Sequence, residues 1–160
     1  MPSKITLGAV IAAIFIAGAA MEPSANAAPP DDACSLLTPA QVSAALSISV
    51  NAGVYMGTYK KTCTWNATSV VPKSAKYVTL VLEALEAYEA GQAPGALKGV
   101  FITPISGIGD DAYYLGGGNN VGLIVKKGNV AFKVAVYGDI PIEKKQAMEK
   151  TLAQQVVSKL

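Results

Sequence analysis

The 160-residue sequence contains no arginine and no histidine. Without arginine, bidentate recognition of phosphate, carboxylate or guanine is excluded. Without histidine, the chain lacks the commonest general base and the commonest transition-metal ligand. Its net charge of +2 is too small to steer nucleic acid or an anionic membrane surface to the protein. We therefore expect no nucleic-acid partner, no metal, no cofactor and no catalytic residue.

The sequence also lacks an apolar run long enough to span a membrane. Residues 7–20 are apolar and uncharged, but this run ends before Glu22, and a spanning helix needs about 20 such residues. Lys4 precedes the run and a small-x-small cleavage site at residues 25–27 follows it, which is the pattern of a secretory signal. Residues 1–27 are therefore predicted to be a cleaved signal peptide, which makes the mature protein periplasmic or secreted, with no membrane span.

Cysteine is scarce as well, because Cys34 and Cys63 are the only two in the chain. In an exported protein an even number of cysteines indicates a disulfide. The loop that this bond would close is worth about 3.5 kcal/mol in the chain-entropy account. The pair lacks the Cys-x-x-Cys spacing of redox sites, so a structural bond is favoured. We expect a flexible leader at residues 28–33 and a single disulfide-stapled, monomeric domain at residues 34–160.

Hydrophobic periodicity predicts a helix near each end of this domain. Thr38 and Gln41 form a capping box with proline in the first turn, which predicts a helix that ends near Leu46. Residues 141–158 repeat apolar side chains at four-residue spacing, with Asp139 as a candidate cap and Glu149 on the polar side.

Strands are predicted between these helices. They lie at residues 61–66, 77–82, 100–105, 112–115, 121–126 and 130–137, with a hairpin partner at about 54–59 and a short helix at 85–90. The pattern predicts an α+β fold, in which a mostly antiparallel sheet of about six strands is flanked by the N-terminal and C-terminal helices in an α/β/α-type sandwich.

The turn-rich segment 107–120 is the predicted binding surface, because loops on a rigid sheet commonly carry function. Its candidate residues are Asp110, Asp111, Tyr113, Tyr114, Asn119 and Asn120. Since neighbours on a strand point to opposite faces, we expect one of the two tyrosines to be buried and the other to face solvent or a groove. The spacing of the acidic residues matches no calcium loop, and such pairs at tight turns usually bond their own backbone.

Three motifs occur in a fixed order along the chain: Cys34-Ser35-Leu36-Leu37-Thr38, Cys63-Thr64-Trp65 and Gly107-Ile108-Gly109-Asp110-Asp111-Ala112-Tyr113-Tyr114. Their order resembles that in small exported bacterial proteins of unknown function, including actinobacterial lipoproteins, over most of residues 32–160. The resemblance implies a PsbP-like fold, with helices on both faces of an antiparallel sheet, and no established catalytic residues. The chain lacks the lipidation cysteine of the lipoprotein members, which implies an unanchored protein.

These patterns predict a non-enzymatic periplasmic or secreted domain that binds a ligand or an envelope partner protein. Two alternatives stay open. One is a hydrolase that uses Asp110 and Asp111, which requires both carboxylates to converge with another acid in a cleft. The other is a structural or envelope accessory role with no binding site.

Overall fold

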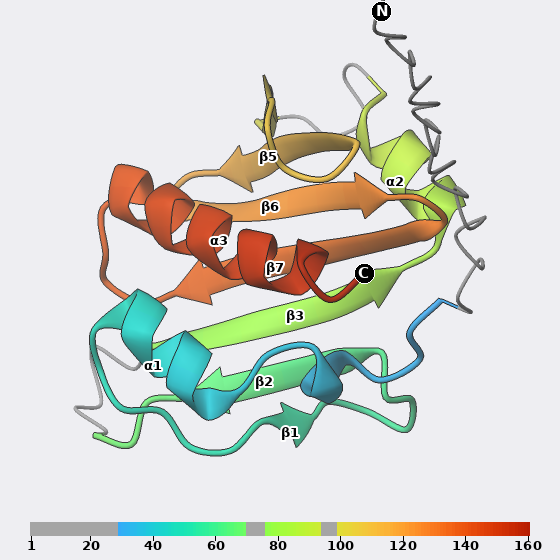
Figure 1. The fold of residues 1–160 in the computed structure, drawn as a ribbon. Coiled ribbons are helices and arrows are strands. Elements are labelled where there is room, and N and C mark those ends of the chain that lie inside the picture. Colours follow the sequence, from blue (N-terminus) through green and yellow to red (C-terminus); the bar gives the residue numbers. More distant parts are fainter. Residues whose placement is uncertain (1–28, 70–75, 94–98) are drawn as a thin grey trace, which may run out of the picture.

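A computed structural model of the protein describes residues 29–69, 76–93 and 99–160 (Figure 1). The predicted signal peptide at 1–27 lies outside these residues. The described elements, in chain order, are η1 (Ala33–Ser35), α1 (Pro39–Leu46), β1 (Val54–Tyr55), β2 (Thr62–Asn66), β3 (Tyr77–Glu83), α2 (Leu85–Gly91), β4 (Phe101–Ile105), β5 (Asp111–Gly117), β6 (Asn120–Lys127), β7 (Val130–Tyr137) and α3 (Ile142–Val157). The predicted α+β class is confirmed, and about six strands is close to the seven observed.

The strands form one open antiparallel sheet in the order β1-β2-β3-β7-β6-β5-β4. Strands β4 to β7 form a meander. Strand β7 then pairs with β3, which joins this meander to the three N-terminal strands at the centre of the sheet. The turn between β6 and β7 contains Gly128 at a φ of 57°, a left-handed conformation that glycine adopts without steric cost. Strand β4, which contains Pro104, is an edge strand, the position in a sheet where proline is tolerated.

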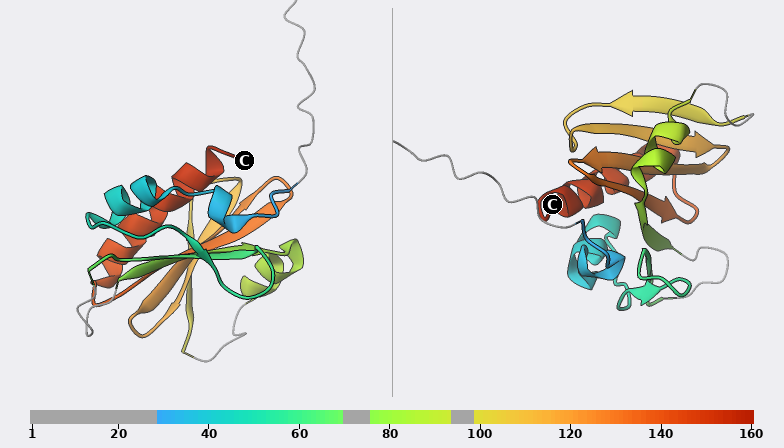
Figure 2. Two further views of the ribbon diagram at one scale, coloured as in Figure 1. Left: turned by 90° about the horizontal axis from the view of Figure 1, so that it is seen from below. Right: turned by 90° about the vertical axis from the view of Figure 1, so that its right-hand side faces the viewer.

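One face of the sheet, here the covered face, carries the main core. Val130, Phe132, Val134 and Val136 alternate along β7 and point to this face, in the period-two pattern of a strand. Helix α3 packs over β6 and β7, and α1 packs beside α3; Figure 2 shows both helices on one side of the twisted sheet.

The opposite face of the sheet, here the open face, is covered by helices to a smaller extent. Among the described helices, α2 packs on it, against β6 and β7 at one end of the sheet. There Tyr88 and Leu85 contact Tyr113 and Ile124 in a second, smaller apolar cluster. The two helical layers therefore differ in extent, and part of the open face has no described helix over it.

The N-terminal segment is held by a disulfide and two caps. Cys34 and Cys63 are bonded, with Cα atoms 5.0 Å apart, as predicted. The Thr38 hydroxyl accepts the Gln41 N–H and the Gln41 side chain accepts the Thr38 N–H, so the predicted capping box is confirmed. Asp32 caps η1, and Ala33, the last residue of the predicted leader, is fully buried.

Two expectations for the C-terminal helix are wrong. The N-cap of α3 is Pro141 and no side chain caps it, so Asp139 does not act as the cap. Glu149 was placed on the polar side but is fully buried against the sheet. Within residues 29–69, 76–93 and 99–160, no helix has the length and apolar character needed to cross a membrane.

Candidate functional site

Tyr113 and Tyr114 point to opposite faces of the sheet, but both are buried, at 1% and 7% exposure. The expectation that one of them faces solvent is wrong because helices cover both faces at this strand. The Tyr113 hydroxyl donates to the carbonyl oxygen of Tyr88 in α2, at 3.1 Å, and the Tyr114 hydroxyl donates to that of Gln146 in α3, at 2.8 Å. Burial raises the pKa of both tyrosines to about 12, which keeps the hydroxyls as donors.

The two aspartates before these tyrosines have separate partners. Asp110 accepts hydrogen bonds from the Gly128 N–H, at 2.6 Å, and from the Lys127 Nζ, at 2.9 Å. These two bonds lower the pKa of Asp110 and fasten its turn to the β6–β7 hairpin.

Asp111 accepts instead from Gln92, at 2.9 Å, and from the Ala112 N–H, at 3.0 Å. Hydrogen bonding by Tyr88 and Gln92 lowers its pKa. Across the described ranges, no three histidine, cysteine, aspartate or glutamate side chains gather as a metal site requires. The convergence with a further acid that a carboxylate hydrolase needs is not formed by the described residues.

Asn119 and Asn120 lie at the β5–β6 turn and have different surroundings. The Asn119 carbonyl oxygen accepts a 2.7 Å hydrogen bond from the Nζ of Lys145, a buried lysine of α3. Asn120 is exposed and lines a hollow on the open face. Of the six predicted surface residues, Asn120 is the one that lines this hollow.

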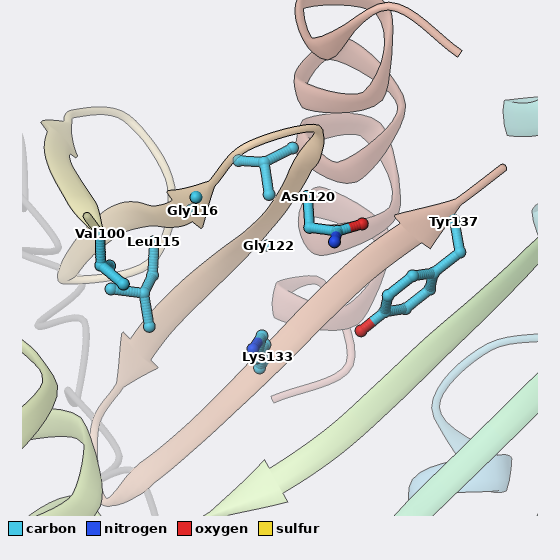
Figure 3. A pocket seen from close by; sticks show the side chains of 9 residues that line it. Val100, Leu115, Gly116, Asn120, Gly122, Lys133 and Tyr137 are labelled. Carbon is cyan, nitrogen blue, oxygen red and sulfur yellow. The ribbon is translucent and has the colours of Figure 1, made fainter. Parts of the chain in front are cut away.

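This hollow has a volume of about 200 Å³ and opens to solvent above β5, β6 and β7 (Figure 3). Its lining residues are Val100, Leu115, Gly116, Gly117, Asn120, Val121, Gly122, Lys133 and Tyr137. Val100 and Leu115 form an apolar wall, and Asn120 and Tyr137 lie on the other side (Figure 3). Lys133 projects from β7 between them.

The hollow lies where β6 and β7 diverge. Their pairing runs only as far as Leu123 opposite Val134. Beyond this point Asn120 pairs with β5 alone and Tyr137 with β3 alone. We call this divergence the β6–β7 split. Gly122 of β6 lies beside the split and lines the hollow.

Gly122 also determines where Lys133 lies. A Cβ atom at Gly122 would be 2.6 Å from the Lys133 Cε, so the lysine stem lies across this glycine. Tyr137 is held from its other side, because its ring stacks on that of Tyr77 with centroids 4.5 Å apart and planes at 10°. The Lys133 stem therefore packs on the backbone of a glycine, and the Tyr137 ring packs on a second ring.

The covered side of the β6–β7 split holds an acid. The Oε1 atom of Glu149 accepts a 2.9 Å hydrogen bond from the Val136 N–H, which β6 does not reach. Its Oε2 atom has no hydrogen-bond partner among the described residues. Burial raises the pKa of Glu149 to about 8, although Val136, Lys145 and Lys133 act in the opposite direction.

Sequence reasoning missed Lys133, Tyr137 and Gly122 as members of a site. One signal was present, since Lys133 interrupts an otherwise apolar strand and marks its second face as polar. Comparison of the chain with protein-family models, curated proteins and solved structures finds no match. The resemblance to small exported bacterial proteins therefore stays a prediction.

Proposed function

We propose that this protein is an exported, non-enzymatic binding domain whose ligand site is the hollow at the β6–β7 split. The observation that carries the proposal is the composition of the hollow: one cation and two hydrogen-bonding side chains face an apolar wall. Small-molecule sites commonly combine an apolar lining with a few placed polar groups. At about 200 Å³ the hollow suits a small ligand rather than a drug-sized one.

Binding rather than catalysis is supported by the state of the acidic residues. Asp110 and Asp111 have lowered pKa values and are hydrogen-bonded to separate partners, which suits fixed turns better than proton transfer. Export is supported by the Cys34–Cys63 disulfide, because such bonds persist in oxidising compartments. Cleavage after Ala27 and a periplasmic location are part of the same proposal.

The proposal is tested by amide NMR spectra of the oxidised protein in the presence of a library of small fragments. We expect shift changes centred on Asn120, Gly122 and Lys133. The variant Asn120→Trp places a bulky ring at the rim of the hollow and is expected to abolish these changes. Asn129→Trp, in the exposed turn of the next hairpin, is the matched control and should retain them. Shift changes that cluster elsewhere, or that survive in Asn120→Trp, would refute the assignment.

A partner protein is a second candidate, favoured by a separate exposed apolar surface. Val54, Tyr55, Met56 and Tyr59 lie at β1 and in the turn after it, and Met56 and Tyr59 are 59% and 79% exposed. Large exposed apolar groups gathered in one place indicate an interaction surface. A partner captured by the wild-type protein and by Asn120→Trp, but not by Met56→Ser/Tyr59→Ser, would support this second candidate.

A further inference from the structure

Among the described residues, Lys133 of the hollow has no ionic partner. Lys133 is half-buried at the centre of the sheet. The two ion pairs in the described part of the chain join Lys60 to Asp32 and Lys127 to Asp110, and neither involves Lys133. The residues that line the hollow include no acid. A partly desolvated cation of this kind is stabilised by an anion that reaches it.

The two acids that interact electrostatically with Lys133 do not serve as its ionic partner. Glu83 and Glu149 both interact electrostatically with Lys133, but among the described residues neither forms an ion pair with it. Glu149 in addition lies on the covered face, hydrogen-bonded to the Val136 N–H. The positive charge of Lys133 is therefore left facing the hollow.

The other residues that line the hollow indicate the size and polarity of the rest of the ligand. Val100 and Leu115 present apolar surface on the side opposite Asn120 and Tyr137 (Figure 3). A cavity of about 150 Å³ holds one benzene ring, so about 200 Å³ accommodates one ring with a single small charged substituent. Asn120 and Tyr137 carry an amide and a hydroxyl that can donate hydrogen bonds to the same substituent.

We propose that the ligand of the hollow is a small organic carboxylate with a single-ring apolar body. The carboxylate binds the Lys133 ammonium group, with Asn120 and Tyr137 as further donors, and the ring lies against Val100 and Leu115. This inference rests on the proposed function, because it names the ligand class of the same site.

Three probes separate the charge from the ring. Benzoate has both, benzamide keeps the shape without the charge, and inorganic phosphate has charge without an apolar body. NMR titrations of the oxidised protein should show benzoate binding at the hollow about tenfold or more tighter than benzamide, with phosphate weaker than benzoate. Loss of one charge-assisted hydrogen bond accounts for a difference in affinity of about tenfold.

Two variants assign the effect to Lys133. Lys133→Gln should reduce benzoate binding to the level of benzamide, while Lys150→Gln, an exposed lysine of α3, should leave it unchanged. Gly122→Ala keeps every charge but places a methyl group where the Lys133 stem lies, so it should weaken benzoate binding by moving the ammonium group.

Any of the following results would contradict the proposed ligand class. Equal binding of benzoate and benzamide at the hollow, or unchanged benzoate binding in Lys133→Gln, refutes the carboxylate while the proposed function stands. Phosphate that binds as tightly as benzoate refutes the apolar body. Absence of any benzoate-induced shift refutes the inference, and the fragment library then decides independently whether the hollow binds ligands at all.

Discussion

Replacement of Glu149 by glutamine should change how the stability of this protein depends on pH. The carboxyl group is fully buried between α3 and β7, and it accepts the Val136 N–H through Oε1. Glutamine keeps an acceptor oxygen for that N–H and places an uncharged amide nitrogen where Oε2 lies. The substitution therefore removes the ability to ionise and preserves the shape of the side chain.

The size and sign of the effect follow from the pKa of Glu149, which rises from 4.5 to about 8 in the folded protein. Between these pH values the folded state binds more protons than the unfolded state, so stability falls as pH rises. Each pKa unit is worth about 1.4 kcal/mol, and the loss is complete above about pH 8. We expect the wild-type protein to lose about 3–5 kcal/mol between pH 5 and pH 9 through this group.

Urea unfolding followed by tryptophan fluorescence measures this loss directly. Trp65 is the single tryptophan of the chain and is almost fully buried, so its emission reports the global transition. Glu149→Gln should resemble the wild type within about 1 kcal/mol at pH 5. At pH 9 it should be the more stable protein by several kcal/mol, because only the wild type carries the buried charge.

Glu143, an exposed acid in the first turn of the same helix, provides the control. Glu143→Gln should shift stability by less than about 1 kcal/mol and leave the shape of the pH profile intact. Parallel pH profiles for the wild type and Glu149→Gln would contradict the reasoning, since they would mean that Glu149 ionises without cost in the folded protein.

The same unfolding assay tests three further features. Replacement of both Cys34 and Cys63 by serine should cost about 3.5 kcal/mol, and an unchanged urea midpoint would count against the bond as a stabilising element. Tyr113→Ala should cost about 3–5 kcal/mol and Tyr113→Phe about 1 kcal/mol, because the ring is core and its hydroxyl makes one hydrogen bond. Thr38→Ala should cost about 1 kcal/mol through loss of the α1 cap, and a larger effect of Thr38→Gly than of Thr38→Ala would argue against capping.

The features that were predicted well from the sequence depend either on neighbouring residues or on a pairing with no alternative. The Thr38–Gln41 capping box needs only a spacing of three residues, and the start of α1 follows from it. Alternation from Val130 to Val136 needs only period two, so the core side of β7 was predictable. The Cys34–Cys63 bond was predictable because no other pairing exists in the chain.

The burial of Tyr113 and Tyr114 could not be predicted in this way. Strand periodicity establishes that the two rings point to opposite faces, but not what packs on each face. Tyr113 is covered by α2 and Tyr114 contacts α3, and these helices lie 20 residues or more away in sequence. A tyrosine with an apolar ring and a polar hydroxyl suits either a surface or a core that supplies an acceptor.

The β6–β7 split explains why the candidate site was also beyond local sequence patterns. Both strands read as continuous, and nothing in either of them shows that pairing ends at Leu123 and Val134. The divergence leaves the Val136 N–H without a strand partner, and an unpaired buried donor is costly. Glu149 supplies the acceptor from the covered face, which accounts for a buried acid in the middle of α3. On the open face the same divergence leaves the hollow beside Lys133, so the acid and the proposed ligand site are two consequences of one interruption in the sheet.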